Sequence, residues 1–254
     1  MKAYILEKSY LSYWLRQMRK KNELIAPVRE RGDIIFKTVE RIHEIALDCP
    51  ASIPSPKEFL TPQFEPLLNI KPASTDELCV STGRVIFGAR SCDMAAIGLL
   101  DKFYLEGHKD PYYAARRNNT LFISVVCGRP DIACFCAGLG TGPYLKGGFD
   151  IQLYDLGDRY FVEAGSKAAS KWVTDYPYLM RKPTKADLED QYEVQLSSQA
   201  MCRKTINLEG ARQALPGLKE DFWREVSARC FECGGCVYEC PLCTCFTAID
   251  RVYE

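Results

Sequence analysis

Six of the thirteen cysteines in this chain lie between positions 230 and 245. The first four are spaced C-x2-C-x2-C-x3-C and are followed by a proline: Cys230, Cys233, Cys236, Cys240 and Pro241. A tight loop with this spacing points several thiolates at one iron-sulfur cube, and its fourth cysteine normally reaches a second cluster. Gly234 and Gly235 let the backbone turn closely in the loop. The run therefore predicts 4Fe-4S ligation, with Cys243 and Cys245 as further candidate metal ligands.

Two other kinds of site also use closely spaced cysteines. Paired C-x2-C units bind zinc, so a zinc knuckle is the main alternative. Disulfides are disfavoured, because cysteines this close together are rarely oxidised partners in a chain without a secretory signal. The run matches the bacterial ferredoxin spacing more closely than a zinc pattern, so we expect iron and sulfide here.

A second group of cysteines, which we call the central cysteines, is spread over the middle of the chain: Cys92, Cys127, Cys134 and Cys136. Cys92 begins the predicted helix that follows a predicted strand at 85–90, and Cys127 ends a predicted strand at 121–127. If these strands are parallel neighbours, their C-terminal ends bring the four thiols together, at the edge where α/β folds usually place ligands. Four sulfurs suffice for a 4Fe-4S cube, although spacing alone leaves an inert, buried role open for one or two. The remaining cysteines have no companions and are expected to be inert: Cys49, Cys79 and Cys202.

Strand and helix patterns alternate around the central cysteines. A helix is expected over residues 8–22, with one buried face made of Tyr10, Leu11, Trp14, Leu15 and Met18. Another is expected from about Cys92 to Tyr104, where Asp93 accepts orphan backbone amides. Further strands are expected at 33–39 and on both sides of a Gly157-Asp158 turn, whereas residues 49–66 hold too much proline for regular structure. This order predicts an α/β domain, with a mixed α+β arrangement as the alternative.

The charged, helical pattern of residues 165–229 is expected to bridge into the C-terminal cysteine run. We therefore divide the chain into two parts. Residues 1–200 form the α/β domain that carries the central cysteines, and residues 201–254 form a helical, ferredoxin-like iron-sulfur segment.

The charge balance excludes some classes of partner. Thirty-three lysines and arginines match thirty-three aspartates and glutamates, so no global field draws the chain to nucleic acid or an anionic membrane. No apolar stretch approaches the roughly 20 residues of a transmembrane helix, and the N-terminal residues form an amphipathic pattern without a cleavage site. The sequence thus predicts a cytoplasmic protein, in which reduced thiols at this density favour metal over disulfides.

Four segments carry a likeness to a known family: VIFGARSCDMAAIGLLDKFYL, DPYYAARRNNTLFISVVCGRPDIACFCAGLGTGP, GGFDIQLYDLGDRYFVEAG and RCFECGGCVYECPLCTCF. The chain resembles the iron-sulfur electron-transfer subunits that include the A subunit of anaerobic sulfite reductase and the beta subunit of soluble sulfhydrogenases. The likeness extends from the N-terminal helix through Cys245, so it covers nearly the whole chain.

The resemblance implies two sets of cluster ligands. The R-x-C-D and C-x6-C-F-C segments then bind one cluster through Cys92, Cys127, Cys134 and Cys136. In the C-terminal run, three cysteines hold a cluster and the fourth faces another: Cys230, Cys233 and Cys236, then Cys240. Family members continue to a second such run, whereas this sequence stops at Glu254. Cys240, Cys243 or Cys245 closes the first cluster, a partner subunit donates the missing ligand, or the sequence is part of a longer chain.

The resemblance also implies a function: an electron-relay subunit with at least two 4Fe-4S clusters in an anaerobic, hetero-oligomeric oxidoreductase complex. Single electrons then pass between a flavin-binding, diaphorase-type subunit and a catalytic redox subunit of sulfite reductase or hydrogenase type. The chain itself is expected to be non-catalytic. Two alternatives stay open: an enzyme subunit whose cluster has an open iron for substrate, and a zinc-stabilised interaction module, which would be colourless.

Overall fold

A mixed β-sheet forms the centre of the structure, a computed structural model that describes residues 2–48, 52–79 and 82–251. Its strands are β1 (Lys2–Glu7), β2 (Glu23–Glu30), β3 (Asp33–Thr38), β6 (Arg84–Ala89), β7 (Thr120–Val125), β8 (Ile151–Asp155), β9 (Arg159–Ala164) and β10 (Met180–Arg181). Within the described residues, these eight strands lie in the order β10-β1-β9-β8-β7-β6-β2-β3. The inner strands β2, β6, β7 and β8 run parallel, and the other neighbours are antiparallel. The predicted α/β fold is therefore confirmed as a mixed sheet.

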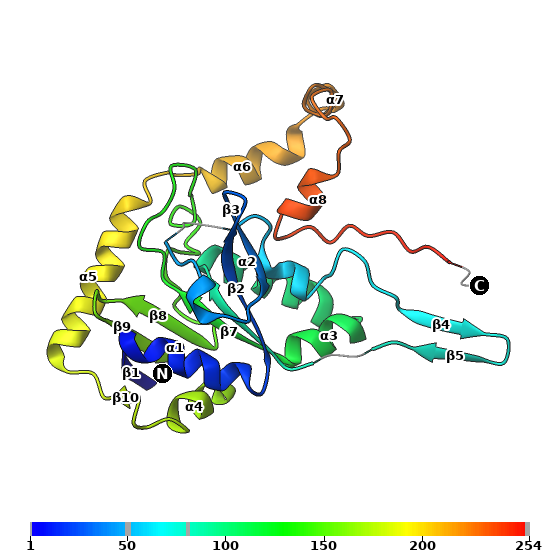
Figure 1. Cartoon of the computed structure of the whole chain (residues 1–254). Helices are drawn as coiled ribbons and strands as arrows, with labels where there is room; N and C mark the ends of the chain where they lie inside the picture. Colours follow the sequence, from blue (N-terminus) through cyan, green and yellow to red (C-terminus); the bar gives the residue numbers. More distant parts are fainter. Residues whose placement is uncertain (1, 49–51, 80–81, 252–254) are drawn as a thin grey trace.

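Helices cover both faces of this sheet, as Figure 1 shows. Helices α1 (Lys8–Arg19) and α4 (Lys167–Thr174) pack on one face, where Trp14 and Val173 join the core. Helices α2 (Ser91–Leu105), α3 (Pro111–Asn118) and α5 (Lys185–Met201) lie on the other face, through residues that include Ile97, Tyr113 and Val194. Burying both faces of the inner parallel strands explains why β6 and β7 are almost uninterrupted runs of apolar residues.

The helix predicted over residues 8–22 ends at Arg19. Trp14, Leu15 and Met18 are fully buried as expected, whereas Tyr10 is 46% exposed. At about 100° per residue, Tyr10 falls at the margin of the stripe that the three buried residues define. The helix therefore has the predicted buried face, but that face is narrower than the sequence pattern indicated.

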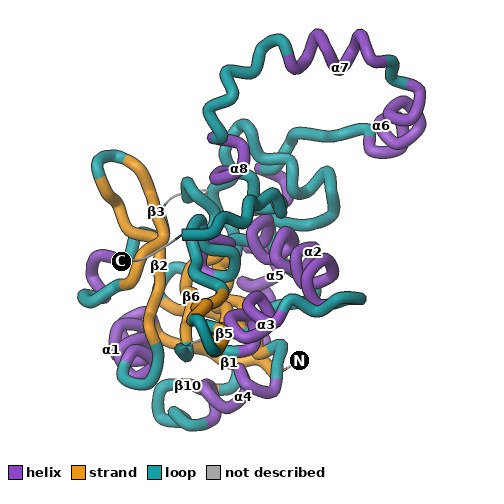
Figure 2. Tube along the Cα trace, turned by 90° about the vertical axis from the view of Figure 1, so that its right-hand side faces the viewer, coloured by secondary structure: helices purple, strands orange, loops and turns teal. Residues whose placement is uncertain are grey.

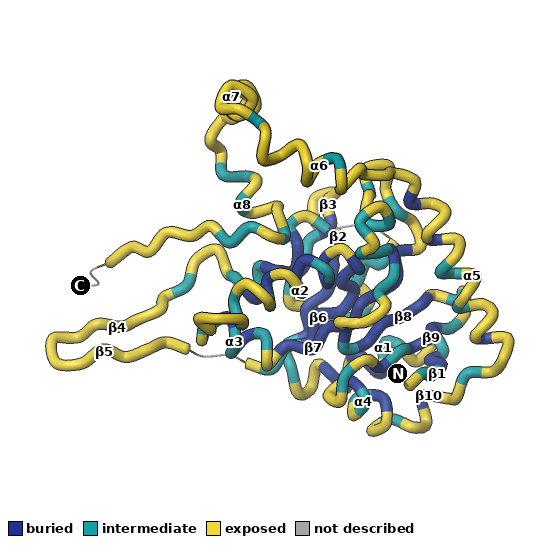
Figure 3. The backbone as a smooth tube through the Cα atoms, turned by 180° about the vertical axis from the view of Figure 1, so that it is seen from behind, coloured by how far each residue is buried: buried dark blue, intermediate teal, exposed yellow. Residues whose placement is uncertain are grey.

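Two excursions leave the body of the protein. The hairpin of β4 (Leu68–Lys71) and β5 (Ser74–Glu77) extends to one side, and every residue of both strands is exposed (Figures 1 and 3). After α5 the chain runs outward through α6 (Leu208–Ala214), η3 (Leu215–Gly217) and α7 (Glu220–Ser227), and returns at α8 (Gly235–Glu239), as Figure 2 shows. None of the helices in the described part of the chain has the length and apolar character needed to cross a membrane.

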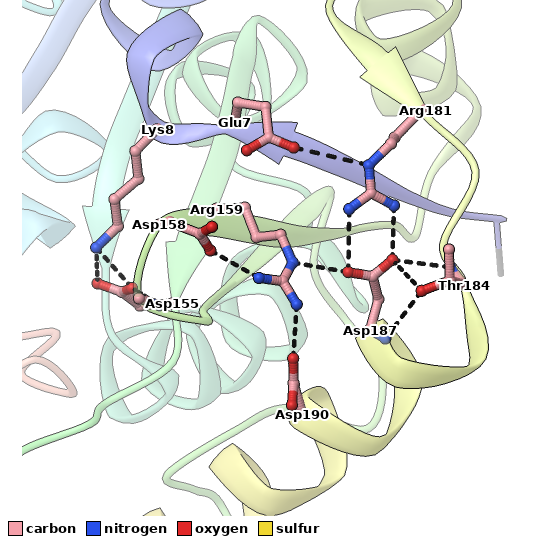
Figure 4. A network of polar contacts seen from close by, with 10 residues as sticks. Glu7, Lys8, Asp155, Asp158, Arg159, Arg181, Thr184, Asp187 and Asp190 are labelled. Carbon is pink, nitrogen blue, oxygen red and sulfur yellow. Dashed lines mark hydrogen bonds and ion pairs between the residues drawn. The ribbon is translucent and has the colours of Figure 1, made fainter.

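An ionic cluster anchors the start of α5 to the sheet (Figure 4). The Asp187 side chain, only 2% exposed, accepts hydrogen bonds from Arg159 on β9 at 2.7 Å and from Arg181 on β10 at 2.6 Å. The same carboxylate accepts the backbone amide and the hydroxyl of Thr184, each at 2.8 Å, which forms a capping box. These donors hold the pKa of Asp187 well below its usual range. The direction in which α5 leaves the sheet is thus set by one buried carboxylate.

Candidate cofactor site

Two parallel strands bring Cys92 and Cys127 to the same edge of the sheet. β6 and β7 pair in parallel up to Ala89 and Ser124, and each strand is followed within a few residues by its cysteine. Cys92 lies in the first turn of α2, and Cys127 begins the long loop that leads to β8. The predicted meeting of the two strand ends is therefore confirmed.

The Arg90 side chain links the end of β6 to the end of β7 through hydrogen bonds. Its buried guanidinium donates to the carbonyl oxygens of Val125 and Val126 at 3.4 and 3.5 Å, and to that of Leu47 at 2.8 Å. A planar guanidinium can reach several carbonyls at once, which a shorter or apolar side chain cannot. The arginine of the R-x-C-D segment thus fixes the backbone on which both of the first two central cysteines stand.

Asp93 caps the start of α2, as the sequence predicted. Its carboxylate accepts the backbone amide of Arg90 at 3.0 Å and the hydroxyl of Ser55 at 3.3 Å. Burial raises the pKa of Asp93, and the two hydrogen bonds act in the opposite direction. This aspartate therefore orients the first turn of α2, and with it Cys92.

The loop after Cys127 folds back, so that Cys136 faces the start of α2. The Cys127 amide donates to the Pro143 carbonyl at 3.2 Å, and the Thr141 amide donates to the Cys136 carbonyl at 2.9 Å. Gly142 passes so close that an added Cβ would collide with Ser91 Oγ and lie 2.8 Å from Cys136 Sγ. The glycine is needed at this position because any side chain would displace the Cys136 thiol.

Cys134 lies in a tight turn of the same loop. Its amide donates to the Asp131 carbonyl at 3.0 Å, and its sulfur accepts the Asp131 amide at 3.1 Å. These two hydrogen bonds fix the position of the Cys134 sulfur in the turn.

Burial and neighbouring thiols raise the pKa values of the central cysteines. Burial is the main cause that raises the pKa of Cys136 to about 12, and the nearby Cys202, Cys134 and Cys127 raise it further. The pKa of Cys92 is also raised, mainly because its sulfur is shielded from water by neighbouring atoms, and further by Asp93, Cys136 and Cys127. The Cys92 residue is nevertheless exposed to solvent. Thiols in this state must give up protons when they bind iron.

Cys202, which the cysteine spacing did not place with the central cysteines, lies beside them. It follows α5, is 7% exposed, and its Sγ lies 3.8 Å from Cys136 Sγ and 3.6 Å from the Cys134 carbonyl oxygen. The expectation that this cysteine has no companion is wrong, because α5 returns the chain to the loop from 66 residues away. Of the other cysteines expected to be inert, Cys79 donates to the Pro111 carbonyl, and Cys49 falls outside the described residues.

The C-terminal cysteines form a more open arrangement. Gly234 adopts a left-handed conformation with φ +73° and begins α8, on which Cys236 lies. The four cysteines of the predicted motif are all exposed: Cys230, Cys233, Cys236 and Cys240. Cys243 and Cys245 are free cysteines that contact each other, and hydrogen bonds from the Cys245 amide and thiol lower the pKa of the Cys243 thiol. The turn at Gly234 agrees with the predicted close loop, whereas the ligand assignment stays a prediction.

No family model matches the chain. The chain is 31% identical, over 258 aligned residues, to the protein named sulfhydrogenase 2 subunit beta from Pyrococcus furiosus. The alignment covers 100% of this chain and 77% of that protein. The chain belongs to the sulfhydrogenase beta subunit family. The family resemblance inferred from the sequence is therefore confirmed.

The central group fits an iron-sulfur cofactor by the chemistry of its donors. Thiolates are the usual ligands of such clusters, and a backbone amide already points at the Cys134 sulfur. In the part of the chain that the structure describes, no set of three or more His, Cys, Asp or Glu side chains is arranged to hold a single metal ion.

Proposed function

We propose that this member of the sulfhydrogenase beta subunit family is an iron-sulfur electron-transfer subunit of a multi-subunit oxidoreductase. The observation that carries the proposal is that Cys92 and Cys127 follow the adjacent ends of the parallel strands β6 and β7, and that the loop with Cys134 and Cys136 folds back against the start of α2. Crevices at this edge of a parallel sheet are where α/β folds bind ligands. A relative named as a hydrogenase subunit supports the oxidoreductase class.

Each part of the chain then has a defined role. The four central cysteines hold one 4Fe-4S cluster, and the C-terminal run holds at least one more through Cys230, Cys233, Cys236 and Cys240. When bound, such clusters accept and release single electrons. Arg90 and Asp93 orient the strand ends and the helix start that present the thiols, and nearby amides and burial tune the potentials.

The partners we propose are a flavin-binding, diaphorase-type subunit and a catalytic redox subunit. The relative is itself named as one subunit among others, which supports a hetero-oligomer. Helix α7 also exposes large apolar side chains that the body of this chain leaves uncovered: Phe222, Trp223 and Val226. Exposed apolar groups of this kind are typical of surfaces that bind another protein.

The deciding experiment is the measurement of iron and acid-labile sulfide per chain on protein purified without oxygen, with EPR spectra of the reduced form. We expect about eight irons per chain, corresponding to two cubes. A colourless protein that contains zinc and no sulfide would refute the proposal in favour of a zinc-stabilised module.

Two cysteine variants separate the two sites. Cys134→Ser is expected to remove the central cluster and to destabilise the α/β body, since its turn is built around that sulfur. Cys233→Ser is expected to remove a different cluster and to leave the α/β body folded, because the C-terminal run is exposed. Iron content, EPR spectra and circular dichroism of both variants test this. Loss of the same EPR signal from both variants would contradict a two-site arrangement.

A further inference from the structure

Lys57 is a buried lysine that binds the C-terminal cysteine run. It lies in η2 (Pro56–Phe59) and is 6% exposed. Its ammonium donates to the carbonyl oxygen of Val237 at 3.0 Å, to that of Cys243 at 3.4 Å, and to that of Cys240. These three acceptors match the three donors of an ammonium group.

Burial of the Lys57 ammonium group has an energetic cost. Burying an ammonium is unfavourable unless its hydrogen bonds are satisfied, and here the acceptors come from a segment about 180 residues further along the chain. Val237 lies in α8 and Cys240 is the C-cap of that helix, where the helix dipole favours a cation. Lys57 is therefore placed to hold the end of α8 and the turn that follows it.

The segment that carries Lys57 also contacts the central cysteines. The Ser55 hydroxyl accepts the Lys57 amide at 3.4 Å and donates to Asp93 at 3.3 Å. Asp93 in turn follows Cys92 and caps the same turn of α2. In Figure 1 the C-terminal run, in red, passes the cyan segment that contains η2. Residues 55–57 thus contact both Asp93, which caps the helix turn that carries Cys92, and the backbone carbonyls of the C-terminal cysteine run.

We propose that residues 55–57 couple the two cysteine groups, with Lys57 as a positioning residue for the C-terminal cluster. This inference rests on the proposed iron-sulfur function. The three hydrogen bonds fix the turn of Cys240 and Cys243 against the α/β body, so the second cluster is held at a set place relative to the first. A cluster held by these cysteines would gain negative charge on reduction, so the ammonium at the Cys240 and Cys243 carbonyls would stabilise the reduced form and raise the reduction potential.

The test compares Lys57→Met with Lys57→Arg in the full chain. Methionine fills similar space but removes the charge and the donors, whereas arginine keeps both. Lys71→Met is the matched control, because Lys71 is an exposed lysine of β4 that pairs with Asp76, away from both cysteine groups. The readouts are iron per chain, the midpoint potential of each EPR signal, and deuterium exchange of the peptide that contains residues 237–245.

In Lys57→Met, we expect the C-terminal signal to shift to a more negative potential while the signal of the central cluster stays at its wild-type potential. Exchange in residues 237–245 is expected to be about tenfold faster, since charge-assisted hydrogen bonds that close the segment are lost. Lys57→Arg is expected to restore most of the potential, and Lys71→Met to match the wild type. Rescue by arginine separates the effect of the charge from a general loss of structure.

Failure of this inference is distinct from failure of the proposed function. If wild-type protein binds iron at both cysteine groups, and Lys57→Met changes neither potential nor exchange, the inference is overturned. If wild-type protein holds no iron at the C-terminal run, the proposed function fails there, and so does the role of Lys57 in setting a potential. The exchange rates, measured without iron, then still decide whether Lys57 holds the run.

Discussion

A thiol that lies next to another sulfur can act on it through hydrogen bonding. Cys202 is in this position relative to Cys136, which we propose as a cluster ligand, because its Sγ lies 3.8 Å from Cys136 Sγ and it is buried. The Cys134 carbonyl oxygen is a second acceptor for the same thiol. Hydrogen bonds to the sulfurs of a cluster are one of the main ways in which a protein tunes its potential. We therefore expect Cys202 to act beside the central cluster rather than as one of its four ligands.

This assignment predicts the behaviour of Cys202→Ser. Serine keeps a donor but shortens its reach, so we expect the iron content to stay at the wild-type level while the EPR signal and potential of the central cluster shift. Cys136→Ser, by comparison, is expected to lose that cluster. The measurement is iron analysis and an EPR redox titration on each variant.

The control for this prediction is Cys79→Ser, because that thiol is exposed and donates to the Pro111 carbonyl at the start of α3. It is expected to behave as the wild type does. Loss of about four irons from Cys202→Ser would make Cys202 a ligand and would remove one of the four central cysteines from that role.

At the scale of the elements, Asp187 is expected to set both the stability of α5 and its pH dependence. Its carboxylate is buried against Arg159 and Arg181, and removing one member of such a pair is strongly destabilising. Arg181 is partly exposed, so the effect is smaller than for a fully buried pair. For Asp187→Asn we expect a loss of about 2–3 kcal/mol in the free energy of unfolding near pH 7.

The pH dependence of this effect has a definite sign. The pKa of Asp187 is lower in the folded state than in the unfolded state, so its contribution is fully present above the unfolded pKa. It is lost as the pH falls below about 4, where the unfolded chain takes up the proton first. Urea unfolding of apoprotein from pH 7 to pH 3 measures this. A difference between wild type and Asp187→Asn that stays constant over this range would contradict the assignment.

Elements with a strong local pattern were predictable from the sequence. The apolar runs of β6 and β7 and the acidic start of α2 specify strand, turn and helix locally, and they place Cys92 and Cys127 correctly. The contacts of Cys202 and Lys57 were not predictable, because each joins segments far apart in the chain. Both contacts depend on where α5 and α8 bring the chain back to the α/β body, and the residues next to Cys202 and Lys57 do not indicate this. The order of the strands in the sheet was not predictable for the same reason.

At the scale of the whole molecule, the α/β body is expected to fold without the C-terminal part. From α6 onward the described residues are exposed or half-buried, so their removal takes little apolar surface from the core. A chain that ends after Asn207 keeps Cys202 and the central group. We expect its thermal unfolding midpoint to fall by no more than about 5 °C, which corresponds to roughly 1–2 kcal/mol for a body of this size.

Circular dichroism melts and EPR spectra of this shortened chain test the proposed boundary near residue 200. The signal of the central cluster is expected to persist, and that of the C-terminal cluster to disappear. If the shortened chain fails to fold, the α/β part and the C-terminal segment are one cooperative unit instead of two.

The position of β1 has a consequence for how the protein is made. β1 pairs with β9, which is synthesised roughly 150 residues later, so at about 5–20 residues per second it waits on the order of 10–30 s for its partner. All four central cysteines precede β9 in the chain, and they therefore leave the ribosome while that side of the sheet is still open. We expect insertion of a cofactor during translation to compete in time with closure of the sheet, so that a slower ribosome favours the loaded protein.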